Sequence, residues 1–212
     1  MSDLGETLES IELLHDFDLE VNSFVLANHE HTLHGIEQRE NEALAETQGA
    51  FKDDPDGMHG VDTQIQIYYE RLRVTAAHLA LVSLVIRLEH WVNKFKRAIP
   101  NVPKDRPHRE RKSMLGRKLD VLNDCLGKGP VPVDFFDDLA IARNSVVHGD
   151  SNGSWLNEYD KRARVPKHYT DDSGGLKFAE DNLRDAVEKA KQQVKWYDEK
   201  FYETRSKTAG TS

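Results

Sequence analysis

The sequence has little of what stabilises secreted or membrane proteins. Its 212 residues include a single cysteine, Cys125, so no disulfide can form within the chain, which fits a reducing cytoplasm. Cys125 stands in an apolar stretch, and we expect a small core residue there rather than a nucleophile. The longest apolar run, residues 76–86, is about half of the roughly 20 residues that span a bilayer, and the acidic residues 1–20 do not resemble a secretory signal. We therefore expect a soluble cytoplasmic protein that does not contact membranes.

Helical spacing of apolar residues recurs along most of the chain and predicts an all-α fold, a helical bundle of about five helices. We expect one domain, residues 1–212, with a long acidic N-terminal helix and turn (1–58), a bundle core (59–204) and a loose tail (205–212). A small β-hairpin is expected near residues 164–178. The expected helices cover residues 3–48, 63–99 with Asp62 as the N-cap, 113–126, 134–148 and 181–204.

Three of these helices have apolar patterns that predict how they pack. The helix 63–99 is apolar nearly all round near Ala80, so we expect it at the centre of the bundle. In the helix 181–204, apolar residues recur in alternating steps of four and three, which is the spacing of a packed seam. The seam consists of Leu183, Val187, Ala190, Val194, Tyr197 and Phe201. The residues expected to face inward from the helix 113–126 are Met114, Leu115, Leu119, Leu122 and Leu126.

Three histidines near the N-terminus, His29, His31 and His34, form a cluster that invites comparison with a metal site. On one helix His31 and His34 are neighbours, whereas His29 points well away from both. No second pair of ligands stands at a matching spacing. We therefore interpret the cluster as a polar helix face, and we expect neither a metal nor another cofactor.

Charge is distributed unevenly along the chain. The formal net charge is −8, yet residues 94–118 contain ten Lys or Arg and only two acidic residues. Such a basic segment is typical of nucleic-acid binding, with Arg109, Arg111 and Lys112 as the candidate RNA contacts. The alternative is that the segment pairs with the acidic first helix or forms a solvated loop. Both interpretations remain open at this stage, and residues 155–170, which mix aromatic and basic groups, are a second candidate RNA contact.

Residues 134–150 have the sequence DFFDDLAIARNSVVHGD and predict a short amphipathic helix that Gly149 ends. Arg143, Asn144 and His148 stand among its apolar residues, although a helix that only packs requires none of the three. The planar guanidinium of an arginine can hold a phosphate, and a histidine can transfer a proton near neutral pH. Together they supply the groups that phosphodiester chemistry needs without a metal.

This pattern of Arg143 with a polar neighbour, followed by His148, resembles the signature of the HEPN superfamily. The resemblance covers about residues 60–204, and less firmly the first helix. It implies a metal-independent endoribonuclease that acts as a homodimer, with a composite active site at the dimer interface, and a role as a toxin or phage-defence effector. Some relatives have a Tyr two positions after the His. This chain has Asp150 there, so behaviour tied to that Tyr is not transferred.

The spacing of the motif leaves two geometries open. Five residues correspond to a rotation of about 140°, so Arg143 and His148 do not share a helix face. They can meet on one phosphate if the helix ends at His148, or if two copies of the helix face each other across a two-fold axis, as the resemblance implies. The alternative is that Arg143 is a surface charge and His148 a C-terminal cap. Glu89 could hold Arg143 in the same subunit, but the sequence alone favours a solvent-facing Glu89.

Two main functional hypotheses follow. In the first, the chain is an endoribonuclease in which His148 acts as general base or acid, Arg143 holds the phosphate, and Asn144 orients His148 or donates to the phosphate. The resemblance also suggests an antitoxin or regulatory partner protein, which the acidic N-terminal region could dock. In the second, the chain is a non-catalytic HEPN-like dimer that binds RNA, a nucleotide or a partner protein. A structural bundle without a nucleic-acid role is a third alternative.

Overall fold

The computed structural model describes residues 15–99, 113–147, 169 and 176–209, with side chains described as far as Thr204. These residues form helices joined by short connections, which confirms the all-α bundle of about five helices. Residues 15–20 are helical and continue into the next two elements without a break. The elements are η1 (Val21–Leu26, a π-helical segment), α2 (Ala27–Ala50), α3 (Pro55–Ala98), α4 (Met114–Leu126), α5 (Val133–Val147) and α7 (Glu180–Ala209).

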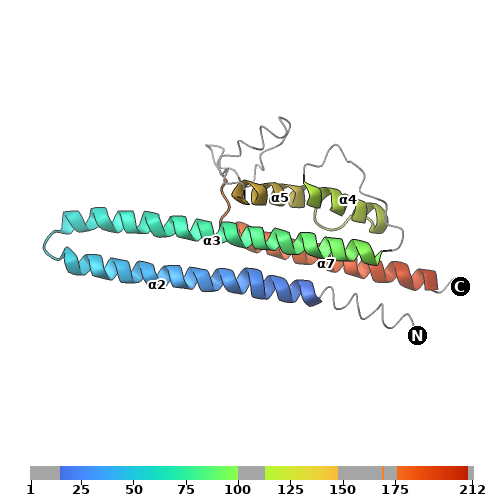
Figure 1. Ribbon diagram of the computed structural model, residues 1–212, viewed down its shortest axis with the longest axis horizontal. Helices are drawn as coiled ribbons and strands as arrows, with labels where there is room; N and C mark the ends of the chain where they lie inside the picture. Colours follow the sequence, from blue (N-terminus) through green and yellow to red (C-terminus); the bar gives the residue numbers. More distant parts are fainter. Residues whose placement is uncertain (1–14, 100–112, 148–168, 170–175, 210–212) are drawn as a thin grey trace, which may run out of the picture.

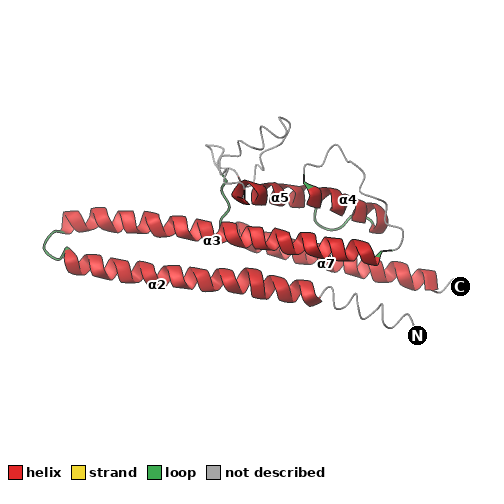
Figure 2. Cartoon of the chain, viewed as in Figure 1, coloured by secondary structure: helices red, strands yellow, loops and turns green. Residues whose placement is uncertain are grey.

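The long helices α2 and α3 form an antiparallel hairpin that dominates the shape of the molecule (Figure 1). The C-terminal half of α3 lies beside α4, α5 and α7, whereas its N-terminal half pairs with α2 and extends away from the other helices (Figure 2). We call this projecting part, residues 36–70, the arm. Among the described residues, no helix is both long and apolar enough to cross a membrane.

The start of α3 differs from the prediction. We expected a turn at residues 53–57 and a helix capped by Asp62, but α3 begins at Pro55. Asp54 is the N-cap, and its carboxylate accepts a hydrogen bond of 3.1 Å from the backbone N–H of Gly57. Asp at the N-cap followed by Pro at the first helical position is a strong signal for the start of a helix. The Asp carboxylate accepts from a free backbone N–H, and Pro has no N–H that would need an acceptor. The Pro and Gly therefore belong to the first turn of the helix.

The C-terminal region also differs from the prediction. Helix α7 continues to Ala209, so residues 205–209 are helical rather than part of a loose tail. Of the expected β-hairpin, the described residues include Tyr169 and residues 176–178, and the rest lies outside them. Among those residues Leu176 forms an isolated β-bridge and no strand longer than this bridge is present, and the backbone N–H of Lys177 donates to the carbonyl oxygen of Tyr169 at 2.7 Å. The expected hairpin therefore stays a prediction.

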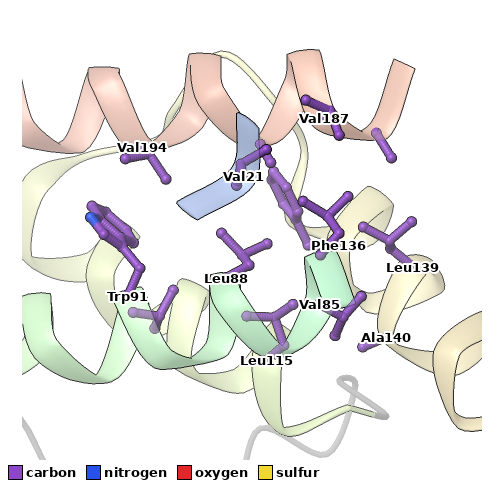
Figure 3. Packing of buried hydrophobic residues seen from close by; sticks show 14 of the residues in the cluster. Val21, Val85, Leu88, Trp91, Leu115, Phe136, Leu139, Ala140, Val187 and Val194 are labelled. Carbon is purple, nitrogen blue, oxygen red and sulfur yellow. The ribbon is translucent and has the colours of Figure 1, made fainter. Parts of the chain in front are cut away.

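The hydrophobic core surrounds the C-terminal half of α3, which confirms the prediction that this helix lies at the centre of the bundle. Val85, Leu88 and Trp91 lie between Leu115 of α4 and the valines of α7 (Figure 3). Burying one large aliphatic side chain stabilises the fold by about 1.5–3 kcal/mol, so this cluster supplies most of the driving force for packing. Every residue of the predicted α7 seam is buried. Leu115, Leu119 and Leu122 are buried as predicted, but Met114 is 52% exposed and that part of the prediction is wrong.

A buried carboxylate on α5 fixes the position of α4. Asp137 accepts a 2.7 Å hydrogen bond from the backbone N–H of Ser113, and the Ser113 hydroxyl accepts one of 2.9 Å from Gly116. These N–H groups belong to the first turn of α4, where the helix dipole favours a negative charge. A side chain at Gly116 would have its Cβ 2.6 Å from a carboxylate oxygen of Asp137, so only glycine fits here. The α4 N-terminus is thus capped from within its own helix and from α5.

We expect Asp137→Ala to lower the free energy of unfolding by about 2–4 kcal/mol, because it leaves buried N–H groups at the α4 N-terminus without an acceptor. The measurement is urea unfolding followed by circular dichroism. Asp124→Ala, which removes an exposed carboxylate from the same helix pair, is the control and should cost less than about 0.5 kcal/mol. Equal losses in the two variants would show that Asp137 does not organise the α4–α5 pair.

Candidate functional site

Arg143 and Asn144 of the motif lie near the end of the described part of α5, a helix that is largely buried. Helix α5 contacts both α3 and α4. Its buried residues include Phe136, Leu139, Ile141 and Ala142. Because these side chains face the core, the helix is held on several sides and cannot rotate about its axis. Arg143 and Asn144, which follow directly, are half-buried at the rim of this packed region.

Arg143 is paired with a carboxylate from α3. Its Nη2 donates to Oε1 of Glu89 at 2.7 Å, and the two side chains are only 19% and 24% exposed. Arg143 is therefore not an isolated surface charge. The sequence favoured a solvent-facing Glu89, and that interpretation is wrong, because packing of α5 along α3 brings together residues 54 positions apart.

The ion pair constrains the guanidinium without using all of its donors. A guanidinium has five N–H donors in one plane, and Glu89 engages one of them through the contact described. The Nε of Arg143 is buried and has no hydrogen-bond partner among the described residues. A carboxylate at one edge fixes the plane of the group and so sets the direction in which its other donors face. An anion placed there would meet a pre-oriented cation.

The other predicted site residues are placed only in part. Asn144 follows Arg143 and is half-buried, with its side chain rotated by about 100° around the helix. The described part of helix α5 runs to Val147, which is 55% exposed. His148 lies outside the described residues, as do Arg109, Arg111 and Lys112. The structure thus brings Arg143, Asn144 and Glu89 to one rim of the bundle.

The histidine cluster of α2 is not a uniform polar face. His31 and His34 are exposed, but His29 is buried, and neither of its ring nitrogens has a hydrogen-bond partner among the described residues. Burial lowers the pKa of His29, while the Glu180 carboxylate works in the opposite direction. Among the described residues, no three His, Cys, Asp or Glu side chains are grouped so that they could hold a metal. Because His29 is buried, the interpretation of the cluster as a polar helix face was wrong for this residue.

Cys125 on α4 is half-buried. Burial raises the pKa of its thiol, and the nearby Asp124 carboxylate adds to the shift. Both effects disfavour the thiolate, which is the nucleophilic form. The raised pKa argues against a nucleophilic role, but Cys125 is only half-buried and is not the core residue that was expected.

Comparisons with known proteins add no assignment. A scan against protein-family models, a search of curated proteins and a search of solved structures each found no match. The resemblance to the HEPN superfamily therefore remains a prediction that rests on Arg143, Asn144 and His148 in a helical bundle.

A double-mutant cycle with Glu89→Ala and Arg143→Ala measures whether the pair interacts energetically. Because both groups are largely shielded from water, we expect a coupling free energy of about 1–2 kcal/mol from urea unfolding. The control cycle uses Glu180→Ala and Arg184→Ala, an exposed pair one turn apart on α7, where the coupling should be below about 0.5 kcal/mol. Additive losses at Glu89 and Arg143 would contradict a fixed ion pair.

Proposed function

We propose that the chain is a metal-independent endoribonuclease of the HEPN type that acts as a homodimer with a composite active site. The observation that supports it most is the 2.7 Å pair between Arg143 of the motif and Glu89 of α3. A surface arginine would lose side-chain entropy on binding a phosphate, whereas one already oriented by a carboxylate loses less. The fold agrees with the all-helical bundle that the resemblance implies.

In the proposed reaction, the RNA itself supplies the nucleophile. The imidazole of His148 takes the proton from a 2′-hydroxyl, and the 2′-oxygen attacks the adjacent phosphorus. The bond from phosphorus to the 5′-oxygen breaks, and an imidazolium returns a proton to that leaving oxygen. Arg143 stabilises the negative charge that develops on the phosphoryl oxygens, and Asn144 orients His148 or donates to the phosphate. The products are a 2′,3′-cyclic phosphate and a 5′-hydroxyl.

Charge supports an RNA substrate at one end of the bundle. Residues 94–118 are strongly basic, and the described part of that segment includes Arg117 and Lys118 on α4. A positively charged region attracts a polyanion and increases its rate of association. A toxin or phage-defence role would require restraint in the cell, so an antitoxin or other regulatory protein is part of the proposal.

One observation favours the second candidate, a non-catalytic dimer that binds RNA, a nucleotide or a partner protein. Glu89 offsets much of the positive charge of Arg143, so an arriving phosphate must share the guanidinium with a carboxylate. In that case the pair would serve to join α5 to α3, and binding would not lead to cleavage. The two candidates differ in whether RNA is broken.

The test incubates the purified protein with tRNA or another structured RNA in EDTA. We expect cleavage to 2′,3′-cyclic phosphate ends, with at least about a 100-fold loss of rate in Arg143→Ala and in His148→Ala. Arg184→Ala, which removes an exposed paired arginine of α7, is the matched control and should cleave at the wild-type rate. Absence of cleavage, or His148→Ala cleaving as fast as wild type, would overturn the enzymatic proposal.

A further inference from the structure

One face of α3 exposes large apolar side chains along the length of the helix. Tyr68, Leu79 and Ile86 are 58%, 62% and 49% exposed. The spacings of eleven and seven residues place all three within about 40° of one direction around the helix. Between Thr75 and Ile86 the helix contains no Asp, Glu, Lys or Arg. We call Tyr68, Leu79, Ile86 and the residues between them on this face the open stripe.

A hollow lies directly beside the open stripe. It has a volume of about 260 Å³ and lies between η1–α2 and α3. Its lining combines apolar side chains, among them Phe24, Val25 and Leu79, with the polar Asn28, His29, Thr32 and Ser83. Phe24 is itself 50% exposed, so the apolar surface continues from α3 onto η1. Exposed apolar side chains beside this hollow form a surface with both a projection and a recess. In a two-fold interface the same surface meets itself, so the projection of each copy can fill the recess of the other.

Charge along the α2–α3 hairpin favours a second copy in antiparallel orientation as the occupant. The arm contains nine acidic and two basic residues, and three of the acidic ones, Asp56, Asp62 and Glu70, lie on α3 itself. Residues 90–99, at the other end of α3, contain Lys94, Lys96 and Arg97 and no acidic residue. A copy related by a two-fold axis through the middle of the open stripe would place each arm over the basic end of the other α3. A parallel arrangement would instead bring like charges together.

We propose that two copies of the chain pair through their open stripes, antiparallel, with the two-fold axis near Val82 and Ser83. In this register Leu79 of each copy lies opposite Ile86 of the other, and Tyr68 lies opposite Arg97, where ring and guanidinium can stack. Glu89 lies about 10 Å along α3 from the axis, so both Arg143–Glu89 pairs flank the interface. The placement of the two Arg143–Glu89 pairs matters for catalysis only if the proposed function holds. The pairing of the two copies rests instead on exposed apolar side chains and charge.

Sedimentation velocity without RNA tests the pairing separately from catalysis. We expect a dimer for the wild-type protein and a monomer for the double variant Leu79→Glu, Ile86→Glu, with helicity unchanged by circular dichroism. Met114→Glu, at a side chain of similar exposure on α4, should remain dimeric. A monomeric wild type, or a double variant that still dimerises, would overturn the inference. Neither result would decide whether Arg143 and His148 cleave RNA.

Cross-linking tests the register in case the double variant unfolds. In a Cys125→Ser background, Ser83→Cys lies next to the axis and should form a disulfide-linked dimer on mild oxidation. Thr75→Cys, whose two copies would lie roughly 20 Å apart along the helix direction, should not. Cross-linking at position 75 with none at position 83 would contradict the proposed antiparallel register.

Discussion

Most sides of the C-terminal half of α3 are apolar and must be shielded from water. From Ala76 to Phe95 it presents ten buried residues, so it is stable only when other helices enclose it. Helices α2, α4, α5 and α7 and the segment η1 all contact α3, and no other element has as many neighbours. This demand for enclosure decides where α5 lies, and thereby where Arg143 meets Glu89. The candidate site is a consequence of how the core closes around one helix.

The sequence predicted the parts of the fold that depend on local pattern. The helical class, the seam of α7 and the extent of α4 follow from the spacing of apolar residues, since a buried face requires that spacing. The start of α3 was missed because Pro55 and Gly57 suggest a turn when read without their capping partner, Asp54. Met114 was misplaced because a residue in the first turn of a helix need not continue the buried face of the later turns.

The contacts between distant residues could not be predicted from the sequence. Arg143 and Glu89, Asp137 and Ser113, and Gln193 and Val131 are each joined by a hydrogen bond across helices. A side chain at Gly129 would displace the buried amide of Gln193, whose oxygen accepts a hydrogen bond from the backbone N–H of Val131. Each pair depends on which helices become neighbours, and periodicity determines only that a face is buried. Candidate residues can thus be named from the sequence, whereas their partners require the packed structure.

The proposed composite site requires that Arg143 of one subunit and His148 of the other act on the same phosphodiester. The most direct measurement mixes inactive Arg143→Ala and His148→Ala proteins, allows subunits to exchange, and assays RNA cleavage in EDTA. A composite site restores one complete site in each mixed dimer, so roughly a quarter of the wild-type rate should return. If the mixture stays as inactive as its components while mixed dimers form, the two residues do not combine across subunits, which contradicts a composite site.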